Sequence, residues 1–268
     1  MNALFTAGAF LRKDFIEETS YRLRFLVEIC GAVIAIYFLV IFSEFMGDAV
    51  AAKLGNIDYL PFALVGIAFH SLHETALNDY SRKIREAQTL GTLEALISTR
   101  TSVFTLMACL PLYSMCRTSL KLVGYMLVGS LILDVNIHWG NWPAALTLFA
   151  ISMVVFGCLG LTFAALTVVF KRTEPIIRGF NLVSFLLGGV FVPLTVFPEW
   201  MQKFAMLIPV VPALHGFRQA VLYDADWATM WPDIAHVLVF MTLLVPLSVM
   251  ALRWAVRRAM LDGSLTQY

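Results

Sequence analysis

The chain has 268 residues, of which 60% are apolar and only 14% charged, and its formal net charge at pH 7 is +1. Soluble domains are typically about 45–50% apolar and about 25% charged, so this composition excludes a soluble protein and indicates an integral membrane protein. The cations flank apolar runs and form no separate basic stripe, which gives no support to a nucleic-acid partner.

An amphipathic stretch opens the chain over residues 3–20. The apolar residues Leu4, Leu11 and Phe15 fall on one helical face, and charged residues occupy much of the remainder. A helix of this kind lies in the membrane interface, so residues 1–24 are expected to form an interfacial helix. A solvated leader to the first membrane span fits the same pattern equally well.

Long apolar runs predict an all-α fold with six transmembrane helices in residues 25–268, at residues 25–45, 59–78, 103–133, 143–170, 176–196 and 232–252. The third run is longer than a ~30 Å hydrocarbon core requires, so its helix must tilt, kink near Pro111 or protrude. Before the fifth run, Thr173 and Pro175 mark a helix start, with threonine as the cap and proline in the first turn.

Three prolines interrupt the apolar region after the fifth span: Pro198, Pro209 and Pro212. They leave two pieces, residues 199–208 and 213–222, each about half as long as a spanning helix. This pattern predicts a re-entrant helical hairpin over residues 198–222, which needs protein or a water-filled path around it.

A short polar stretch, residues 85–99, stands between the second and third spans. Leu90, Leu93 and Ile97 fall on one helical face, whereas Glu86 and Glu94 belong to its polar surface. The stretch is too short and too polar to cross a bilayer, so it is expected to form a helix that a partner contacts.

Most of the 19 Lys and Arg residues stand on one side of the predicted spans, in the N-terminal segment, the loops after spans two and four, and the C-terminal tail. The positive-inside rule therefore predicts that both termini and residues 85–99 are cytoplasmic and that the hairpin is extracellular. An even number of spans agrees with this orientation.

Two parts of the sequence resemble ABC type-2 exporter permeases. Glu86, the run 91–96 and the pair Ser98–Thr99 resemble that family's coupling region, although Arg100 stands where many members carry proline. In the C-terminal half, three segments resemble its fifth span and extracellular re-entrant helices: residues 188–193, residues 197–198 and residues 209–218. The order and spacing of these motifs extend the resemblance over nearly the whole chain.

The resemblance implies a transport subunit of the inner membrane, in which two permease copies pair and two cytoplasmic ATPase subunits dock beneath them. No G-x-x-x-x-G-K-[ST] phosphate loop occurs in the sequence, so ATP and Mg²⁺ are expected in the partner ATPase and no cofactor in this chain. The residues expected to contact the ATPase are Arg85, Glu86, Leu90, Gly91, Thr92, Leu93 and Glu94. The residues expected at an outer gate are Phe197, Pro198, Trp200, Pro209 and Pro212.

Arg117 and Lys121 stand four residues apart inside the third apolar run, hence on one helical face. Charges at this depth usually face a bundle interior, a partner or water. They either line the route of an anionic head group or form structural ion pairs with Glu44, Glu74 or Asp79. Snorkelling within an overlong helix is a further alternative.

Aromatic residues run through the fifth span, and Phe185 and Phe191 are candidates for a stacking path for sugar rings, with ordinary core packing as the alternative. His70, His73 and Glu74 form an H-x-x-H-E pattern, but without further Cys or His nearby no metal site is expected. Polar packing between helices accounts for these three residues.

The sequence therefore predicts the permease subunit of an ATP-driven exporter for a lipid-linked glycan, a glycolipid or another amphiphile such as a drug. An ATP-independent secondary carrier or channel is the alternative. That class predicts internal repeats, and none is visible in this sequence.

Overall fold

The computed structural model describes residues 3–19, 22–54, 58–92, 102–133, 135, 141–170 and 172–261. These residues form helices and their connecting turns, in keeping with the predicted all-α class. The α-helices are α1 (Ala3–Thr19), α2 (Arg22–Leu54), α3 (Tyr59–Thr89), α5 (Val103–Cys109), α6 (Leu112–Ile132), α7 (Trp142–Phe170), α8 (Glu174–Leu187), α9 (Glu199–Ala205), α10 (Val210–Leu222) and α11 (Trp227–Leu261), with a 3₁₀ turn η1 at Leu194–Val196.

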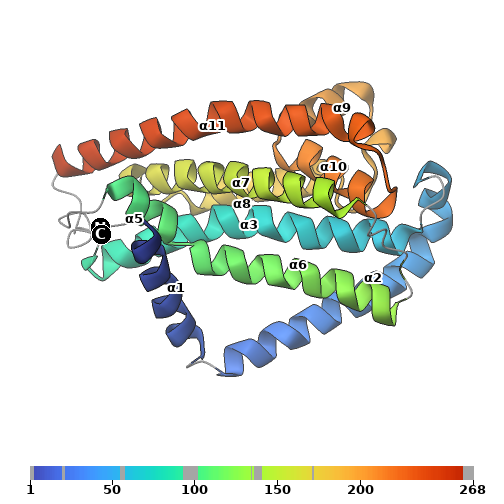
Figure 1. Ribbon diagram of the computed structural model, residues 1–268, viewed down its shortest axis with the longest axis horizontal. Coiled ribbons are helices and arrows are strands. Elements are labelled where there is room, and N and C mark those ends of the chain that lie inside the picture. The colour runs from blue at the N-terminus through green and yellow to red at the C-terminus, as the bar shows by residue number, and fades with distance from the viewer. Residues whose placement is uncertain are drawn as a thin grey trace.

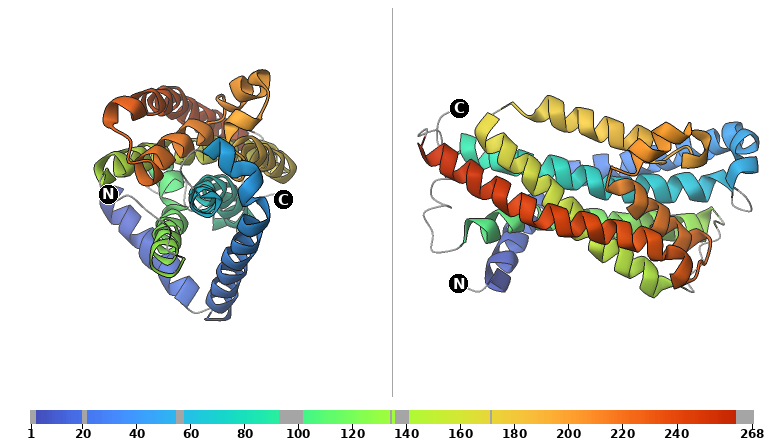
Figure 2. Two further views of the ribbon diagram at one scale, coloured as in Figure 1. Left: turned by 90° about the vertical axis from the view of Figure 1, so that its right-hand side faces the viewer. Right: turned by 90° about the horizontal axis from the view of Figure 1, so that it is seen from above.

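The long helices run along a common axis (Figure 1). Seen down that axis, α3 lies near the middle of the bundle (Figure 2), and it contacts α2, α6, α7, α8 and α10. Helix α1 crosses the bundle at the end where α3 and α11 finish, whereas α9 and α10 lie at the opposite end (Figure 1). The two ends therefore differ in architecture.

Within the described residues, three helical stretches are long and apolar enough to cross a membrane: Phe104–Ile132, Trp142–Phe170 and Trp227–Leu261. The pair α9 and α10 adds a fourth if its bent helices form one span. Helix α2 contains only the shorter apolar stretch Cys30–Phe45. Length and composition thus confirm a multi-pass membrane protein, and the count of six spans stays a prediction.

Several helix boundaries follow the local signals of the sequence. Helix α5 ends before Pro111 and α6 begins after it, so the helix is interrupted at the proline that the sequence analysis named as one alternative, because proline lacks the N–H that a continuous helix needs. Helix α8 begins after Thr173 with a proline in its first turn, again as predicted. The hydroxyl of Thr173 forms a hydrogen bond of 2.6 Å with that of Thr167 rather than capping the helix.

The predicted fifth span is wrong at its C-terminal end. Helix α8 ends at Leu187 and not at residue 196. Gly189 has a φ of +68°, a left-handed conformation that glycine adopts without steric cost, and this residue turns the chain away from the helix axis. The apolar run continues past the turn, so hydropathy alone places the end too late.

Helices α9 and α10 meet at an angle of 94°, which confirms a break in this apolar region. The second piece starts at Val210 rather than at residue 213, because Pro212 lies in its first turn, where a missing N–H has no intrahelical acceptor to lose. Whether the pair re-enters the membrane as a hairpin stays a prediction.

The core lies where α3, α7 and α10 meet. The ring of Phe69 on α3 is 4.8 Å from that of Phe217 on α10 and 5.9 Å from that of Phe156 on α7. Gly160 lets α3 and α7 approach closely, since a Cβ atom there would lie 2.5 Å from the carbonyl oxygen of Ala76. This packing fixes the face that α3 turns toward the core.

Candidate functional site

Helix α3 carries a polar stripe on the side opposite its core face. The stripe, spaced by three or four residues and hence on one side of the helix, consists of Ser71, Thr75, Asn78, Arg82 and Arg85. The core-facing residues Phe69, Leu72, Ala76, Leu77, Tyr80 and Ile84 are buried. Polar side chains on a central bundle helix are expected to face water, protein or a ligand rather than lipid.

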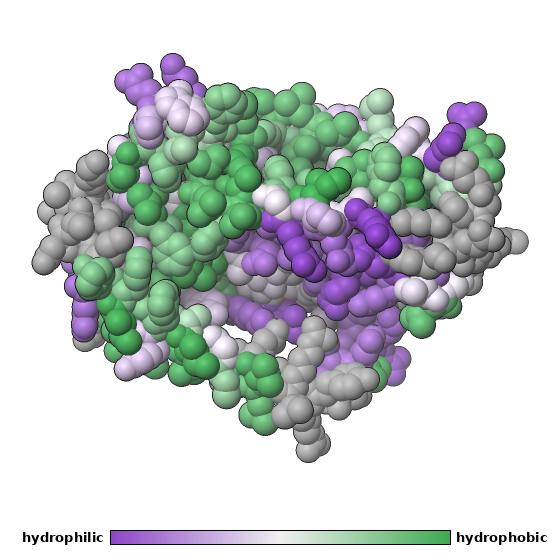
Figure 3. All heavy atoms as spheres, turned by 180° about the vertical axis from the view of Figure 1, so that it is seen from behind, coloured by the Kyte–Doolittle hydropathy of each residue, from purple (hydrophilic) through white to green (hydrophobic). Residues whose placement is uncertain are grey.

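Three cavities border the polar stripe, with volumes of about 490, 590 and 470 Å³. The first lies between α3 and α6, the second between α1, α3 and α6, and the third between α3 and α8. Arg82 lines all three. From behind, hydrophilic surface gathers around a hollow on a face that is otherwise largely apolar (Figure 3). These cavities form a candidate polar cleft along α3.

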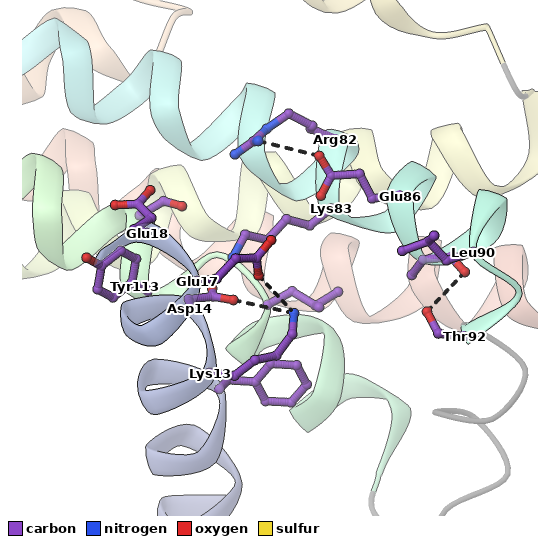
Figure 4. A pocket seen from close by; sticks show the side chains of 14 residues that line it. Lys13, Asp14, Glu17, Glu18, Arg82, Lys83, Glu86, Leu90, Thr92 and Tyr113 are labelled. Atoms are coloured by element: carbon purple, nitrogen blue, oxygen red, sulfur yellow. Dashed lines mark hydrogen bonds and ion pairs between the residues drawn. The ribbon is translucent and has the colours of Figure 1, made fainter. Parts of the chain in front are cut away.

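Ion pairs hold α1 against the cleft (Figure 4). Asp14 forms an ion pair with Lys83 of α3, and the side chains of both are mostly buried. Glu18 accepts hydrogen bonds of 2.7 and 2.8 Å from the guanidinium of Arg117 on α6. The carboxylates Asp14 and Glu18 therefore face the bundle, whereas Lys13 and Glu17 are exposed, as are Phe5 at 69% and Phe15 at 55%.

Arg117 and Lys121 both line the 490 Å³ cavity between α3 and α6. Arg117 forms an ion pair with Glu18 of α1, a carboxylate that the sequence analysis does not name as a partner. The hydroxyls of Thr75 and Thr118 lie 3.2 Å apart and join α3 to α6 beside the cavity. Arg117 therefore forms an ion pair with α1 and also lines the cavity between α3 and α6.

The residues predicted to contact an ATPase differ in their surroundings. Residues 85–89 are the last turns of α3 and not the start of a separate helix, because the helix runs past the apolar part of the second span. Arg85 forms an ion pair with Glu174 at the start of α8, and Glu86 lies 3.4 Å from Arg82.

Beyond Thr89 the chain leaves the helix. Gly91 has a φ of +67°, which favours glycine at this turn. Leu90 is 76% exposed, a large value for an apolar side chain, and Thr92 is also exposed. Leu93 and Glu94 lie outside the described residues. The described part of the segment therefore offers Leu90 as its prominent apolar contact.

The aromatic residues proposed for a sugar path pack against other aromatic rings. The ring of Phe185 is 5.3 Å from that of Phe191 and 5.3 Å from that of His70, and Phe191 is 6.1 Å from Phe42. Both phenylalanines are half-buried beside the core. These contacts favour packing, and none of the three cavities is lined by either ring.

The predicted gate residues lie at the end of the bundle opposite α1, around α9 and the start of α10. Trp200 is 61% exposed and its ring is 6.3 Å from that of Phe204. Phe197 is half-buried and Pro198 is exposed, whereas Pro209 and Pro212 are buried. Pro198 and Trp200 thus lie at the surface, whereas Pro209 and Pro212 are packed near the bend between α9 and α10.

The His70, His73 and Glu74 pattern does not converge on one point. His73 is fully buried, with ring centroids 5.1 Å from Phe156 and 5.9 Å from Phe180. Glu74 is exposed and lines the cavity beside α8. Within the described residues, no three His, Cys, Asp or Glu side chains stand close enough to hold a metal ion.

Arg218 on α10 has a structural role that the sequence analysis missed. It is 5% exposed and donates hydrogen bonds to the carbonyl oxygens of Gly189 at 2.7 Å, Val190 at 2.9 Å and Phe62 at 2.8 Å. Its guanidinium also lies 3.5 Å from the centre of the Phe62 ring, a cation–π contact. The signal available in the sequence was a single arginine among the mostly apolar residues of a short helix.

Comparison with known proteins adds one match. A family model described as ABC-2 type transporter matches residues 29–222, which include α3, α6 and the pair α9 and α10. No curated protein matches the sequence.

Proposed function

The chain belongs to the ABC-2 type transporter family, and we propose that it moves an amphiphile, such as a lipid-linked glycan, a glycolipid or a drug, outward across the inner membrane. As a membrane permease of this family it is a transport subunit without ATPase activity. The family also implies association with ABC ATPase subunits, which hydrolyse ATP. The proposal adds the direction of transport and the class of cargo.

The polar stripe of α3 is the observation that carries this proposal. A central helix with polar side chains from Ser71 to Arg85, bordered by three cavities, suits the passage of a polar head group beside apolar helices. An amphiphile needs both environments, since its head group requires polar partners and its tail requires an apolar surface.

The proposed topology has six spans and cytoplasmic termini. It is supported by the common end at which α1 lies and α3 and α11 finish (Figure 1), where the predicted cytoplasmic cations also stand. Arg82, Lys83 and Arg85 on α3 and Arg257 on α11 are among these cations. We propose that two copies of the chain pair in the membrane, as the resemblance implies.

The exposed turn at Leu90 is proposed as the apolar contact for the ATPase. Arg85 links the same region to α8 through Glu174, and Glu86 links it to Arg82 on the polar stripe. Force applied near Leu90 would therefore act on α3 and α8 together.

Affinity purification of the tagged full chain from its native membranes tests this function. An ABC ATPase is expected to copurify, and Leu90→Asp is expected to reduce its yield several-fold by placing a charge in an apolar contact. Leu207→Asp is the matched control, because Leu207 is 69% exposed and lies at the opposite end, between α9 and α10. Equal loss in both variants would contradict the assignment of Leu90.

Transport by the purified complex distinguishes the two classes of transporter. In proteoliposomes, export of a labelled amphiphile is expected only when ATP is supplied on the ATPase side. Transport by the isolated chain, driven by an ion gradient without ATP, would instead support a secondary carrier.

A further inference from the structure

We propose that the cavity between α3 and α6 binds a phosphate group, and that Glu18 of α1 stays paired with Arg117 until this anion displaces it. The inference rests on the proposed function, because it assigns a head-group chemistry to the exported amphiphile. It concerns binding alone, so it can be tested without transport or ATP.

The cavity wall supplies the donors that a phosphate requires. Arg117 and Lys121 stand one helical turn apart on α6 and both line the 490 Å³ space. Hydroxyl groups surround them, on Ser71, Thr75, Thr118 and Tyr125. The planar guanidinium of arginine matches two oxygens of a phosphate, and lysine adds a compact positive charge.

Among the described residues that line the cavity, Asp79 is the carboxylate, and it pairs with Arg82. Asp79 lies 3.0 Å from Nη2 of Arg82 on its own helix, which also contacts Glu86 at 3.4 Å. These contacts pair Asp79 with a cation of its own helix, and Arg82 lines the same cavity. The cavity volume also falls within the roughly 300–1,000 Å³ of ordinary ligand sites.

Glu18 lines the neighbouring 590 Å³ cavity and pairs with Arg117 from there. Both of its carboxylate oxygens are within 2.8 Å of the same Arg117 nitrogen, and the two side chains keep 21% and 23% of their surface exposed. An intramolecular carboxylate at this distance is a stand-in for a phosphate oxygen. A phosphate has more oxygens than a carboxylate and can contact Arg117 and Lys121 together.

The position along α6 suits a lipid head group or a soluble phosphate that enters from one end. At 1.5 Å per residue, Arg117 and Lys121 lie roughly 8 and 14 Å from the first residue of α6. The candidate membrane span Phe104–Ile132 begins earlier, so both cations stand near its middle. Glu18 of α1 nevertheless pairs with Arg117, which connects the site to the end of the bundle where α1 lies.

Displacement of Glu18 would leave the ion pair of Asp14 and Lys83 between α1 and α3. Because α1 lies at the end of the bundle where Leu90 is exposed, loading of the cavity would change the surface offered near the proposed ATPase contact. The arrangement thus links head-group binding to the position of α1.

Lipid retention by the full chain in nanodiscs tests the proposal. The chain is reconstituted in phosphatidylcholine containing one-fifth phosphatidylglycerol, and the lipids that stay bound after detergent release are identified by native mass spectrometry. A second arm measures the thermal stability of the detergent-purified chain in inorganic phosphate against chloride at equal ionic strength. The variants are Glu18→Gln, the double variant Arg117→Gln with Lys121→Gln, and Arg253→Gln as an exposed cation outside the cavity.

Glu18→Gln is expected to increase phosphatidylglycerol retention several-fold, a gain that misfolding cannot produce. The double variant is expected to lose about tenfold, since charge-assisted hydrogen bonds are removed, while Arg253→Gln matches the wild type. If only the inorganic phosphate arm responds in this pattern, the ligand is a soluble phosphate. If neither arm separates Glu18→Gln and the double variant from Arg253→Gln, the proposal is overturned, and ATPase copurification still tests the proposed function.

Discussion

Nη2 of Arg218 donates a hydrogen bond of 2.8 Å to the carbonyl oxygen of Phe62, a residue 156 positions earlier in the chain. The bond ties α10 to the first turns of α3, and the same side chain holds the turn that follows α8. Gly66 makes room for this contact, since a side chain there would meet the Arg218 guanidinium. The helix that carries the polar stripe is thereby attached to the bent pair at its far end.

Arg218→Ala is expected to lower the free energy of unfolding by about 3 kcal/mol, because buried carbonyl groups lose their donor. Arg218→Lys is expected to recover little, since an ammonium cannot reproduce the fork of donors or its stacking on Phe62. Thermal unfolding of the purified chain in detergent measures both. Arg178→Ala is the control, because the Arg178 side chain is 78% exposed; equal effects at both positions would refute this role of Arg218.

Gly160→Ala is expected to destabilise the contact between α3 and α7. The added Cβ would lie 2.5 Å from the carbonyl oxygen of Ala76 and 2.6 Å from a ring carbon of Tyr80, so the helices must separate, at a cost of roughly 1–3 kcal/mol. Gly157→Ala, one turn earlier, meets only the Tyr80 hydroxyl at 3.5 Å and is expected to be tolerated. Yield of monodisperse protein and the unfolding temperature compare the two variants. A tolerated Gly160→Ala would argue against close packing here.

Asp14→Asn is expected to loosen α1, because it leaves the mostly buried Lys83 beside a neutral side chain. Hydrogen exchange followed by mass spectrometry should show the amides of α1 exchanging about tenfold faster, which corresponds to the loss of about one charge-assisted bond. Glu17→Gln is the control, since the side chain of Glu17 is 62% exposed and its ion pair with Lys13 is a surface contact. Unchanged exchange in Asp14→Asn would mean that other contacts hold α1.

Arg85→Glu is expected to weaken the link between the end of α3 and the start of α8, and Glu174→Arg is expected to do the same. Combining the two substitutions restores opposite charges and should recover part of the loss. The stabilities of the four proteins form a double-mutant cycle, with an expected coupling of about 0.2–1 kcal/mol for this partly exposed pair. Additive effects would show that the two side chains do not act together.

The sequence predicts breaks in the helices better than it predicts their lengths. The sequence predicts the helix break at Pro111 and the helix start after Thr173, because each depends only on neighbouring residues. The end of α3 could not be placed at Thr89 from hydropathy, since the helix continues through polar residues that the bundle supports on one side. Hydropathy places the end of α8 too late for the opposite reason, since apolar residues continue beyond the turn at Gly189.

The partners in the polar cleft were beyond the reach of sequence spacing. Arg117 was recognisable as a costly charge within an apolar run, but its partner Glu18 lies 99 residues earlier on a separate helix. Only the packing of α1 across α3 and α6 brings the two together. The same holds for Arg218, whose acceptors are backbone carbonyls and leave no mark in the residue types.

The inward-facing carboxylates of α1, Asp14 and Glu18, make ionic strength an experimental variable for the purified chain. In a bilayer, the outward Phe5 and Phe15 can rest against lipid, but a detergent micelle solvates these rings wherever the helix lies. The remaining attachment includes the partly exposed pair of Glu18 and Arg117, which salt screens over a Debye length of about 8 Å at 0.15 M. Buffers of low salt therefore favour a docked α1, and preparations made in high salt select for its release.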